Sequence, residues 1–353
     1  MGAGRAAASL VYAGGAVATG PRQLPAKSPT ERQGRAGWTP WALAAGAVTL
    51  WSSLGVVSRY FLADLRPDQR LVGVLFFTVV ALSAIVAWQR DTPLSGGWAP
   101  FLTPLREAVP MGLLSPFLYF LLFSSSAALL PAHETQFLNA AWPLVAYLLD
   151  PQRQGRTTIL FAVITATCYV LFWGYRATQQ PLLDTDLLGI LLGGGAALAF
   201  GSYSAFANRL RWWQAANLLS LLLLASLSAL LLSLLWYGGA ELFGAWRVEA
   251  MPTGCPLLSG FPAPVLHLAG FILLGTCNSA LAYLMWIRSM IGTTPAGRAY
   301  LGLLTLPLAV LWIGLLGPQA CRPEVLPLEP VLFTGILLGV LFANERIARR
   351  QAD

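Results

Sequence analysis

The stretch LYFLLFSSSAALLPAHETQFLNAAWPL, residues 118–144, recurs in a related form as AYLMWIRSMIGTTPAGRAYLGLLTLPL, residues 282–308. Both copies contain two apolar runs around a short turn, and each run belongs to a longer apolar segment of about twenty residues, the length that crosses a bilayer as a helix. At an offset of 164 positions the identical pairs include Tyr119 and Tyr283, Pro131 and Pro295, Ala132 and Ala296, Pro143 and Pro307, and Leu144 and Leu308. The chain therefore contains an internal repeat that includes a pair of predicted membrane spans.

The composition excludes an ordinary soluble protein. Of 353 residues, 56% are hydrophobic and only 10% are charged, whereas a soluble domain has roughly 25% charged residues. Apolar runs of about twenty residues recur along the chain, and a helix of that length spans the hydrocarbon core. We predict an all-α polytopic membrane protein with ten transmembrane helices, near residues 39–61, 71–88, 107–130, 132–149, 157–174, 187–208, 214–236, 266–287, 296–316 and 330–345.

The basic residues predict the orientation of these spans. With the N-terminus inside, the outer loops hold five basic residues, namely Arg66, Arg70, Arg176, Arg247 and Arg322, and the inner segments hold sixteen of the 22 in the chain. Arg59 lies within the first span. Because Lys and Arg concentrate on the cytoplasmic side, we expect both termini in the cytoplasm and the protein in the inner or plasma membrane. The net charge of +7 is spread over loops, so we expect no nucleic-acid partner.

The repeat predicts an inverted architecture. The offset of 164 relates the third and fourth spans to the eighth and ninth, and a weaker offset of 150 places Ser52 opposite Ser202 and Arg59 opposite Arg209. Each repeat then has five spans, and an odd number forces the second repeat into the membrane the other way round, as in many secondary transporters. We expect a disordered cytoplasmic tail at 1–37, a first repeat at 38–180 and an inverted second repeat at 181–350.

The fourth span contains the strongest candidate for a transport site. Pro143 has no N–H to donate and displaces the carbonyl four residues back, which belongs to Asn139. Together with Trp142, the kinked span offers an amide, a freed carbonyl and a large ring near the middle of the bilayer. The alternative interpretation is an interhelical hydrogen bond beside a packing tryptophan. Pro307 repeats the kink in the ninth span, where it predicts a hinge.

Other polar or aromatic residues at similar depth are candidates for lining a pocket, with ordinary helix packing as the alternative. They are Trp51, Tyr119, Tyr203 and Asn278, and Tyr283 is a further mid-membrane candidate. Arg59 and Glu134 lie near the outer ends of their spans, where long side chains often extend to the headgroups. A sharper hypothesis is that these two residues pair across the first and fourth spans, with Glu134 as a proton-responsive outer gate.

The sequence has no motif of a metal, cofactor or catalytic site, such as a P-loop or HExxH. We therefore predict no enzyme activity, no catalytic residue, no metal and no cofactor. Cys255 and Cys321 fall in two predicted outer loops, where a disulfide is one interpretation and two free thiols the other.

The sequence resembles the ten-helix drug/metabolite transporter superfamily in its EamA-type branch. The segments with this resemblance include LWSSLGVVSRYFL at 50–62, FLNAAWPL at 137–144 and ALAFGSYSAFANRL at 197–210. The FLNAAWPL segment is similar to a signature of the aromatic amino acid exporters, with Ala140 where that group has a tyrosine. The resemblance implies a central cavity between two five-helix halves, rocking of those halves, and export of amino acids or related metabolites with proton coupling. It places Trp51, Tyr119, Asn139, Trp142, Tyr203 and Asn278 near that cavity.

We therefore predict a secondary transporter that exports neutral or aromatic amino acids or related small metabolites. Its partners would be a small solute, the lipid bilayer and coupled protons. One alternative is a carrier of another solute, such as a nucleoside, a sugar or a drug-like cation. The other is a non-transporting membrane sensor or scaffold that uses the outer loop at 237–265, and that alternative predicts a packed rather than hydrated centre.

Overall fold

The computed structural model describes residues 39–88, 99–149, 156–179, 183–209, 215–243, 261–290 and 301–316, together with single residues 293, 298, 332, 335, 336, 338, 339, 342, 343 and 346. The chain divides into two units, Met1–Gly37 and Trp38–Asp353. The first unit, and with it the predicted tail, lies outside the described residues, as do Cys255 and Cys321. All regular secondary structure described in the second unit is helical.

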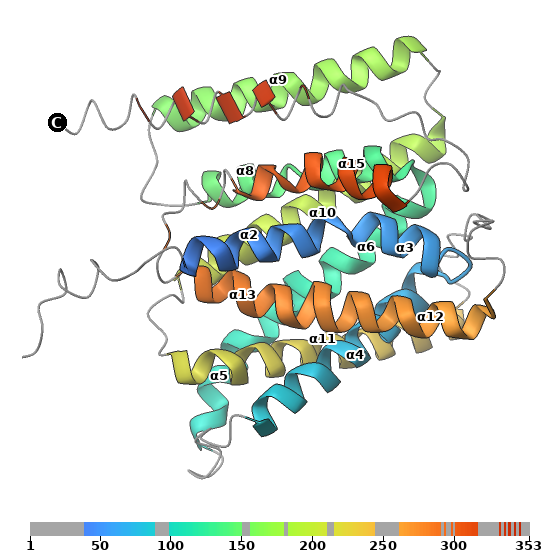
Figure 1. Ribbon diagram of the computed structural model, residues 1–353, viewed down its shortest axis with the longest axis vertical. Coiled ribbons are helices and arrows are strands. Elements are labelled where there is room, and N and C mark those ends of the chain that lie inside the picture. The colour runs from blue at the N-terminus through green and yellow to red at the C-terminus, as the bar shows by residue number, and fades with distance from the viewer. Residues whose placement is uncertain are drawn as a thin grey trace, which may run out of the picture. The chain divides into compact units, whose positions relative to one another are not determined.

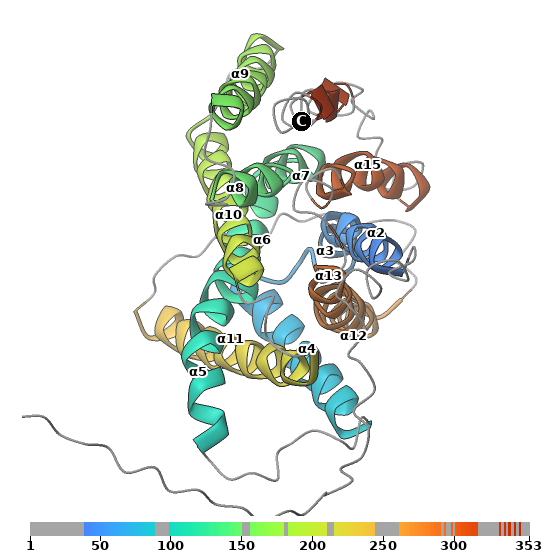
Figure 2. The ribbon, with the colours of Figure 1, turned by 90° about the vertical axis from the view of Figure 1, so that its left-hand side faces the viewer.

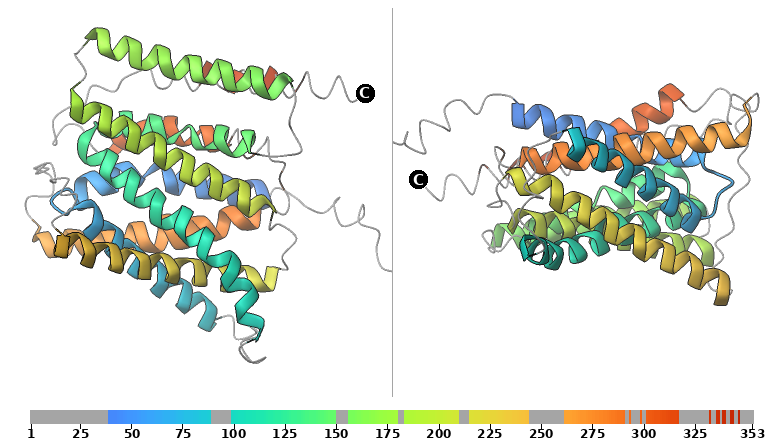
Figure 3. Two further views of the ribbon diagram at one scale, coloured as in Figure 1. Left: turned by 180° about the vertical axis from the view of Figure 1, so that it is seen from behind. Right: turned by 90° about the horizontal axis from the view of Figure 1, so that it is seen from below.

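The helices of the N-terminal part are α2 (Thr39–Ser52), α3 (Leu54–Phe61), α4 (Pro67–Trp88), α5 (Ala99–Gly112), the π-helical segment η2 (Leu113–Leu118), α6 (Tyr119–Leu129), α7 (Ala132–Asn139) and α8 (Trp142–Leu148). Those that follow are α9 (Arg156–Gln179), α10 (Asp184–Arg209), α11 (Ala215–Phe243), α12 (Ala263–Ile272), the π-helical segment η4 (Leu273–Leu281), α13 (Ala282–Ser289) and α15 (Thr305–Leu316). Most of them cross the unit in roughly parallel or antiparallel directions (Figures 1 and 3), and Figure 2 views many nearly along their axes.

The described helices coincide with the first nine predicted spans, with shifted boundaries. Within the part of the chain that the structure describes, six helical stretches are long and apolar enough to cross a membrane: 39–61, 67–88, 106–129, 186–207, 218–241 and 263–289. Helix α11 extends to Phe243 and α12 begins at Ala263, so the predicted outer loop at 237–265 is helical at both of its ends. The tenth predicted span lies largely outside the described residues, and the ten-helix arrangement remains a prediction.

The predicted break in the fourth span is present. Helix α7 ends at Asn139, and α8 begins at Trp142 with Pro143 in its first turn. Between them the Ala141 N–H donates to the Leu138 carbonyl at 3.1 Å, a tighter pattern than that of an α-helix. The ninth span is interrupted in the same way at Leu304, just before α15 and three residues before Pro307, as Ala140 is before Pro143. Discontinuous helices of this kind are typical of transporter binding sites.

Two close helix contacts join segments that the predicted repeat would relate. A Cβ atom added to Gly275 of η4 would lie 2.6 Å from the Val74 carbonyl oxygen of α4. A Cβ atom added to Gly112 of α5 would meet the Ala225 carbonyl oxygen of α11. Val74 precedes Ala225 by 151 positions and Gly112 precedes Gly275 by 163, close to the offsets of 150 and 164 in the sequence. Each difference departs from the sequence offset by one position, and the two-repeat arrangement stays a prediction.

Candidate functional site

A cluster of aromatic side chains surrounds the break between α7 and α8. We define the aromatic cluster as Trp51, Tyr119, Trp142, Phe200, Tyr203, Tyr283 and Trp286. They come from five helices, α2, α6, α8, α10 and α13, and each is at most 5% exposed. The cluster therefore unites segments that are far apart in the sequence.

Trp51 occupies a central position in this cluster. Its ring centroid lies 5.0 Å from that of Phe200, 5.6 Å from Tyr283 and 6.2 Å from Trp142. The ring planes meet at 84°, 79° and 83° respectively, so ring edges point at ring faces, a favoured arrangement of aromatic quadrupoles. Trp286 completes the surroundings at 5.2 Å from Trp51.

Two asparagines border the aromatic cluster, one from each predicted repeat. The Asn139 amide donates to the Tyr119 hydroxyl at 3.2 Å. The Asn278 side-chain amide donates to the Leu50 backbone carbonyl and, at 3.1 Å, to the Ser53 hydroxyl. The Trp51 indole donates to the backbone carbonyl of Asn278 at 3.0 Å. Among the described residues, neither side-chain oxygen has a hydrogen-bond donor. Buried acceptors without partners are rare in proteins and need an explanation.

The six residues predicted to bind substrate all lie in or beside the aromatic cluster, namely Trp51, Tyr119, Asn139, Trp142, Tyr203 and Asn278. Sequence reasoning missed Phe200 and Trp286. Each is three positions from a candidate residue on the same helix, Tyr203 and Tyr283 respectively, and that spacing places side chains on one helix face. The spacing was a signal that could have identified both.

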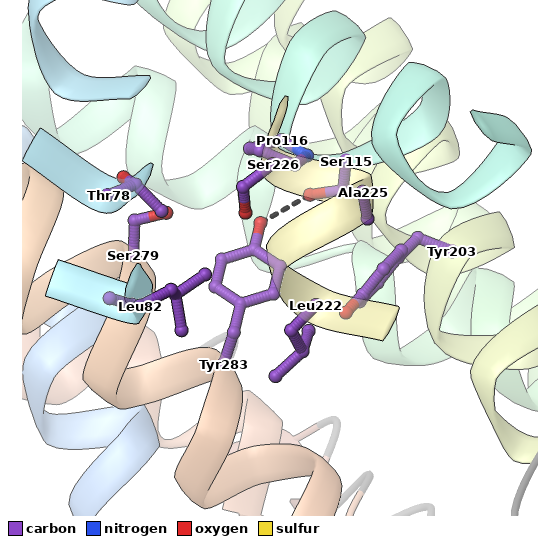
Figure 4. A pocket seen from close by; sticks show the side chains of 11 residues that line it. Thr78, Leu82, Ser115, Pro116, Tyr203, Leu222, Ala225, Ser226, Ser279 and Tyr283 are labelled. Atoms are coloured by element: carbon purple, nitrogen blue, oxygen red, sulfur yellow. Dashed lines mark hydrogen bonds between the residues drawn. The ribbon is translucent and has the colours of Figure 1, made fainter. Parts of the chain in front are cut away.

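A small cavity lies next to the aromatic cluster, between α4, η2, α10, α11 and η4. Within it, the centre of a water-sized sphere can move through about 10 Å³. The cavity therefore has room for about one water molecule. Its hydroxyl-bearing lining residues are Thr78, Ser115, Tyr203, Ser226, Ser279 and Tyr283. Figure 4 shows the Tyr283 hydroxyl pointing toward Ser115 and Ser226, with the Ser115 hydrogen bond drawn. The Tyr203 hydroxyl has no partner among the described residues.

Pro116 explains why Ser115 faces this cavity. A residue before proline is pushed out of the helical conformation, and Ser115 has φ −155° and ψ 126°, an extended backbone between α5 and α6. Ser279, at the repeat offset of 164 from Ser115, lies in η4 on the opposite side of the cavity. The kink at Ser115 and the segment η4 therefore border the same space.

The contact described for Glu134 is with another arginine, and the pairing of Arg59 with Glu134 stays a prediction. Glu134 of α7 binds Arg176 of α9, with 3.1 Å between Nε and Oε1, and Arg176 also lies 3.4 Å from Asp186 of α10. Glu134 is 5% exposed and Asp186 is 9% exposed. Arg176 therefore joins carboxylates of two helices, α7 and α10. Arg59 lies in the last turn of α3.

A second charged group joins the segment between α3 and α4 to α11 and α12. His267 lies 2.8 Å from a carboxylate oxygen of Asp64. Arg66 binds Asp68 at 2.9 Å and also Glu241, and these two hydrogen bonds raise the pKa of Arg66 above its ordinary value. These side chains are more exposed than those of Glu134, Arg176 and Asp186, so their ionic contacts contribute little to stability.

Residues 39–152 match the sequence model described as the EamA-like transporter family. The EamA-like segment begins with α2 and ends just after α8, so it contains Trp51, Tyr119, Asn139 and Trp142. The match confirms the resemblance to the EamA branch, and the aromatic amino acid exporter group remains a prediction.

The other comparisons show the fold. A comparison with curated proteins gives no significant match. A solved structure described as "Crystal structure of protein" aligns with a TM-score of 0.58 at 18% identity, over 89% of this chain and 99% of that one. At this identity the likeness shows a shared fold alone. The EamA-like family and the apolar helices together indicate a multi-pass membrane transporter of small metabolites.

Proposed function

We propose that the protein exports neutral, and especially aromatic, amino acids or related small metabolites across the cytoplasmic membrane by alternating access. The observation that supports this most is the convergence of the six predicted residues on the broken helix between α7 and α8. The cluster residues themselves have no charged side chain, so a solute without net charge is favoured. Aromatic rings pack favourably edge to face, so a cluster of rings is suited to bind an aromatic solute.

The burial of the aromatic cluster supports alternating access. With every ring at most 5% exposed and a cavity for about one water, a solute of amino-acid size enters only when helices separate. The breaks at Ala140 and Leu304 provide points at which such a separation can occur. Helix ends are common hinges. Both breaks lie next to the cluster, because a Cβ atom added to Gly302 would lie 2.7 Å from the Trp142 ring.

Glu134 remains our candidate for coupling to protons, and Arg176 is an ionic partner of its carboxylate. Loss of the negative charge would release Arg176 from α7 and loosen the contact of α7 with α9. We expect Glu134→Gln to reduce the dependence of transport on pH. A pH profile identical to that of the wild type would exclude this role.

Both termini are proposed to lie in the cytoplasm.

The test is efflux of labelled amino acids from loaded proteoliposomes, with and without a pH gradient. Saturable efflux of phenylalanine, tyrosine or tryptophan supports the proposal. Asn139→Ala and Trp142→Ala should each lower that efflux at least tenfold while remaining folded in detergent. Unchanged efflux in both folded variants would show that the transport site lies elsewhere. The absence of saturable flux for all solutes would favour the sensor or scaffold alternative, with which the packed centre is also consistent.

An organic cation is the second candidate solute. Three indole rings, those of Trp51, Trp142 and Trp286, lie within 6.2 Å of one another by centroid. Indole faces attract quaternary ammonium groups through cation–π interactions. A tetraalkylammonium ion in the same efflux panel separates the two candidates, because a cation carrier would prefer it to phenylalanine.

A further inference from the structure

Three polar side chains of α7 lie buried on one side of the helix, next to the aromatic cluster. Thr135, Gln136 and Asn139 are 0%, 1% and 2% exposed. At 100° per residue, they fall within a single arc of about 100° on the helix surface. Asn139 donates to Tyr119 at 3.2 Å, so this arc faces the aromatic cluster.

The polar atoms of this arc have almost no partners. The Thr135 hydroxyl, both amide atoms of Gln136 and the Asn139 side-chain oxygen make no hydrogen bond with any described residue. A buried amide that lacks both of its partners is unusual, because its desolvation is not compensated. These atoms therefore need partners that the helices around them do not provide.

The surroundings leave room for a group beside Gln136. Gly55 of α3 lies opposite, and a Cβ atom added there would be 3.7 Å from the Gln136 side-chain oxygen. The glycine thus leaves a methyl-sized space next to the amide without a clash. This space lies on α7 just before the break at Ala140, where the predicted transport site begins.

We propose that Gln136, with Thr135 and Asn139, binds the amino and carboxylate groups of the transported amino acid, while the aromatic cluster binds its ring. This inference rests on the proposed function. The amide oxygens of Gln136 and Asn139 are acceptors for an ammonium group, and the Gln136 N–H and the Thr135 hydroxyl are donors for a carboxylate. The arc therefore complements both charges of a zwitterion without a charged side chain of its own.

The chemistry predicts discrimination between solutes that share a ring and differ in the head group. The probes are phenylalanine, phenethylamine, which lacks the carboxylate, and 3-phenylpropionate, which lacks the ammonium. Wild-type protein in proteoliposomes should transport phenylalanine at least tenfold better than either. A site built to hydrogen-bond a polar group rejects analogues that lack it, because its own groups then stay unpaired.

Variants of Gln136 test its role. Gln136→Leu should reduce the preference for phenylalanine over phenethylamine at least tenfold, and Gln136→Glu should shift selectivity toward phenethylamine, because the new carboxylate attracts its ammonium. Thr135→Val provides a second variant if Gln136→Leu does not fold. Leu138→Met is the matched control on the same helix, since Leu138 faces Gly193 of α10 instead, and it should leave all three rates unchanged.

Two outcomes would overturn the inference, and they differ in what they mean for the proposed function. If Gln136→Leu and Gln136→Glu leave the ratios among the three transport rates unchanged, Gln136 has only a structural role. The transport proposal then survives. If the wild type transports none of the three probes, both the inference and the proposed function for aromatic amino acids fail.

Discussion

Two glycines of α10 offer a direct measurement of how tightly the broken helix is held. Gly201 lies against the first turn of α8, and an added Cβ atom would be 2.8 Å from the backbone oxygen of Trp142 and 2.7 Å from Val145 Cγ1. Gly194, two turns earlier on α10, has no heavy atom within 4 Å of the same added atom. The substitutions Gly201→Ala and Gly194→Ala thus make the same chemical change in one helix, with and without a steric conflict.

The expected difference in stability follows from two terms. Replacing a helical glycine by alanine stabilises by about 0.5–1 kcal/mol, and both variants gain this term. Only Gly201→Ala overpacks its neighbours, at about 1–3 kcal/mol, and the conflict with a backbone oxygen cannot be relieved by rotating a side chain. We expect Gly194→Ala to equal or exceed the wild type in stability and Gly201→Ala to be about 1–3 kcal/mol less stable than Gly194→Ala.

The assay is thermal unfolding of the purified proteins in one detergent, followed by efflux measurements on the folded fraction. Gly201→Ala should also lower efflux, because the alanine pushes Trp142 and α8 away from α10. A Gly201→Ala protein as stable and as active as Gly194→Ala would show that α8 does not pack on α10 at this distance. The position of the site at the break would then need revision.

Three further substitutions test other contacts. Asn139→Leu removes a buried unpaired oxygen, which relieves a cost of about 1–3 kcal/mol, and one hydrogen bond, which loses about 0.6 kcal/mol in membrane proteins. The unfolding temperature of this variant should match or exceed that of the wild type while its efflux falls at least tenfold. A large loss of stability would contradict the unpaired state of that oxygen. Arg176→Leu leaves Glu134 and Asp186 buried without their cation and should destabilise by about 3–5 kcal/mol; an unfolding temperature equal to that of the wild type would show that the cluster is not formed. Arg66→Gln breaks an ionic contact in which Glu241 has 42% of its side chain exposed. The free energy of unfolding should therefore fall by less than about 1 kcal/mol. A loss as large as that of Arg176→Leu would refute the ranking of these two contacts by burial.

The sequence predicted the spans well because length and apolar character determine where a helix can cross a membrane. It was less accurate at the ends of the spans, where polar residues join the helices. Pro67 and Asp68 lie before the predicted second span and begin α4, and Glu241 lies within α11 beyond the predicted seventh span. Local composition does not show how far a helix continues into the polar region.

The candidate site was predicted in part because proline and the repeat leave signals in a single sequence. Pro143 indicated the break, and its counterpart Pro307 follows a similar break. Arg176 as the partner of Glu134 could not be predicted, because the pairing depends on how α9 packs against α7. Gln136 was missed for a related reason: a glutamine near a helix start is usually solvent-exposed, and only tertiary packing buries this one.

The hydroxyls around the cavity have a consequence for the direction of transport. Ser115 and Ser279 are related by the repeat offset and line the same space, and the repeat pairs Tyr119 with Tyr283 in the same way. A solute that arrives from either compartment would therefore meet nearly the same set of donors and acceptors. For the proposed carrier we therefore expect similar half-saturation concentrations for influx and efflux.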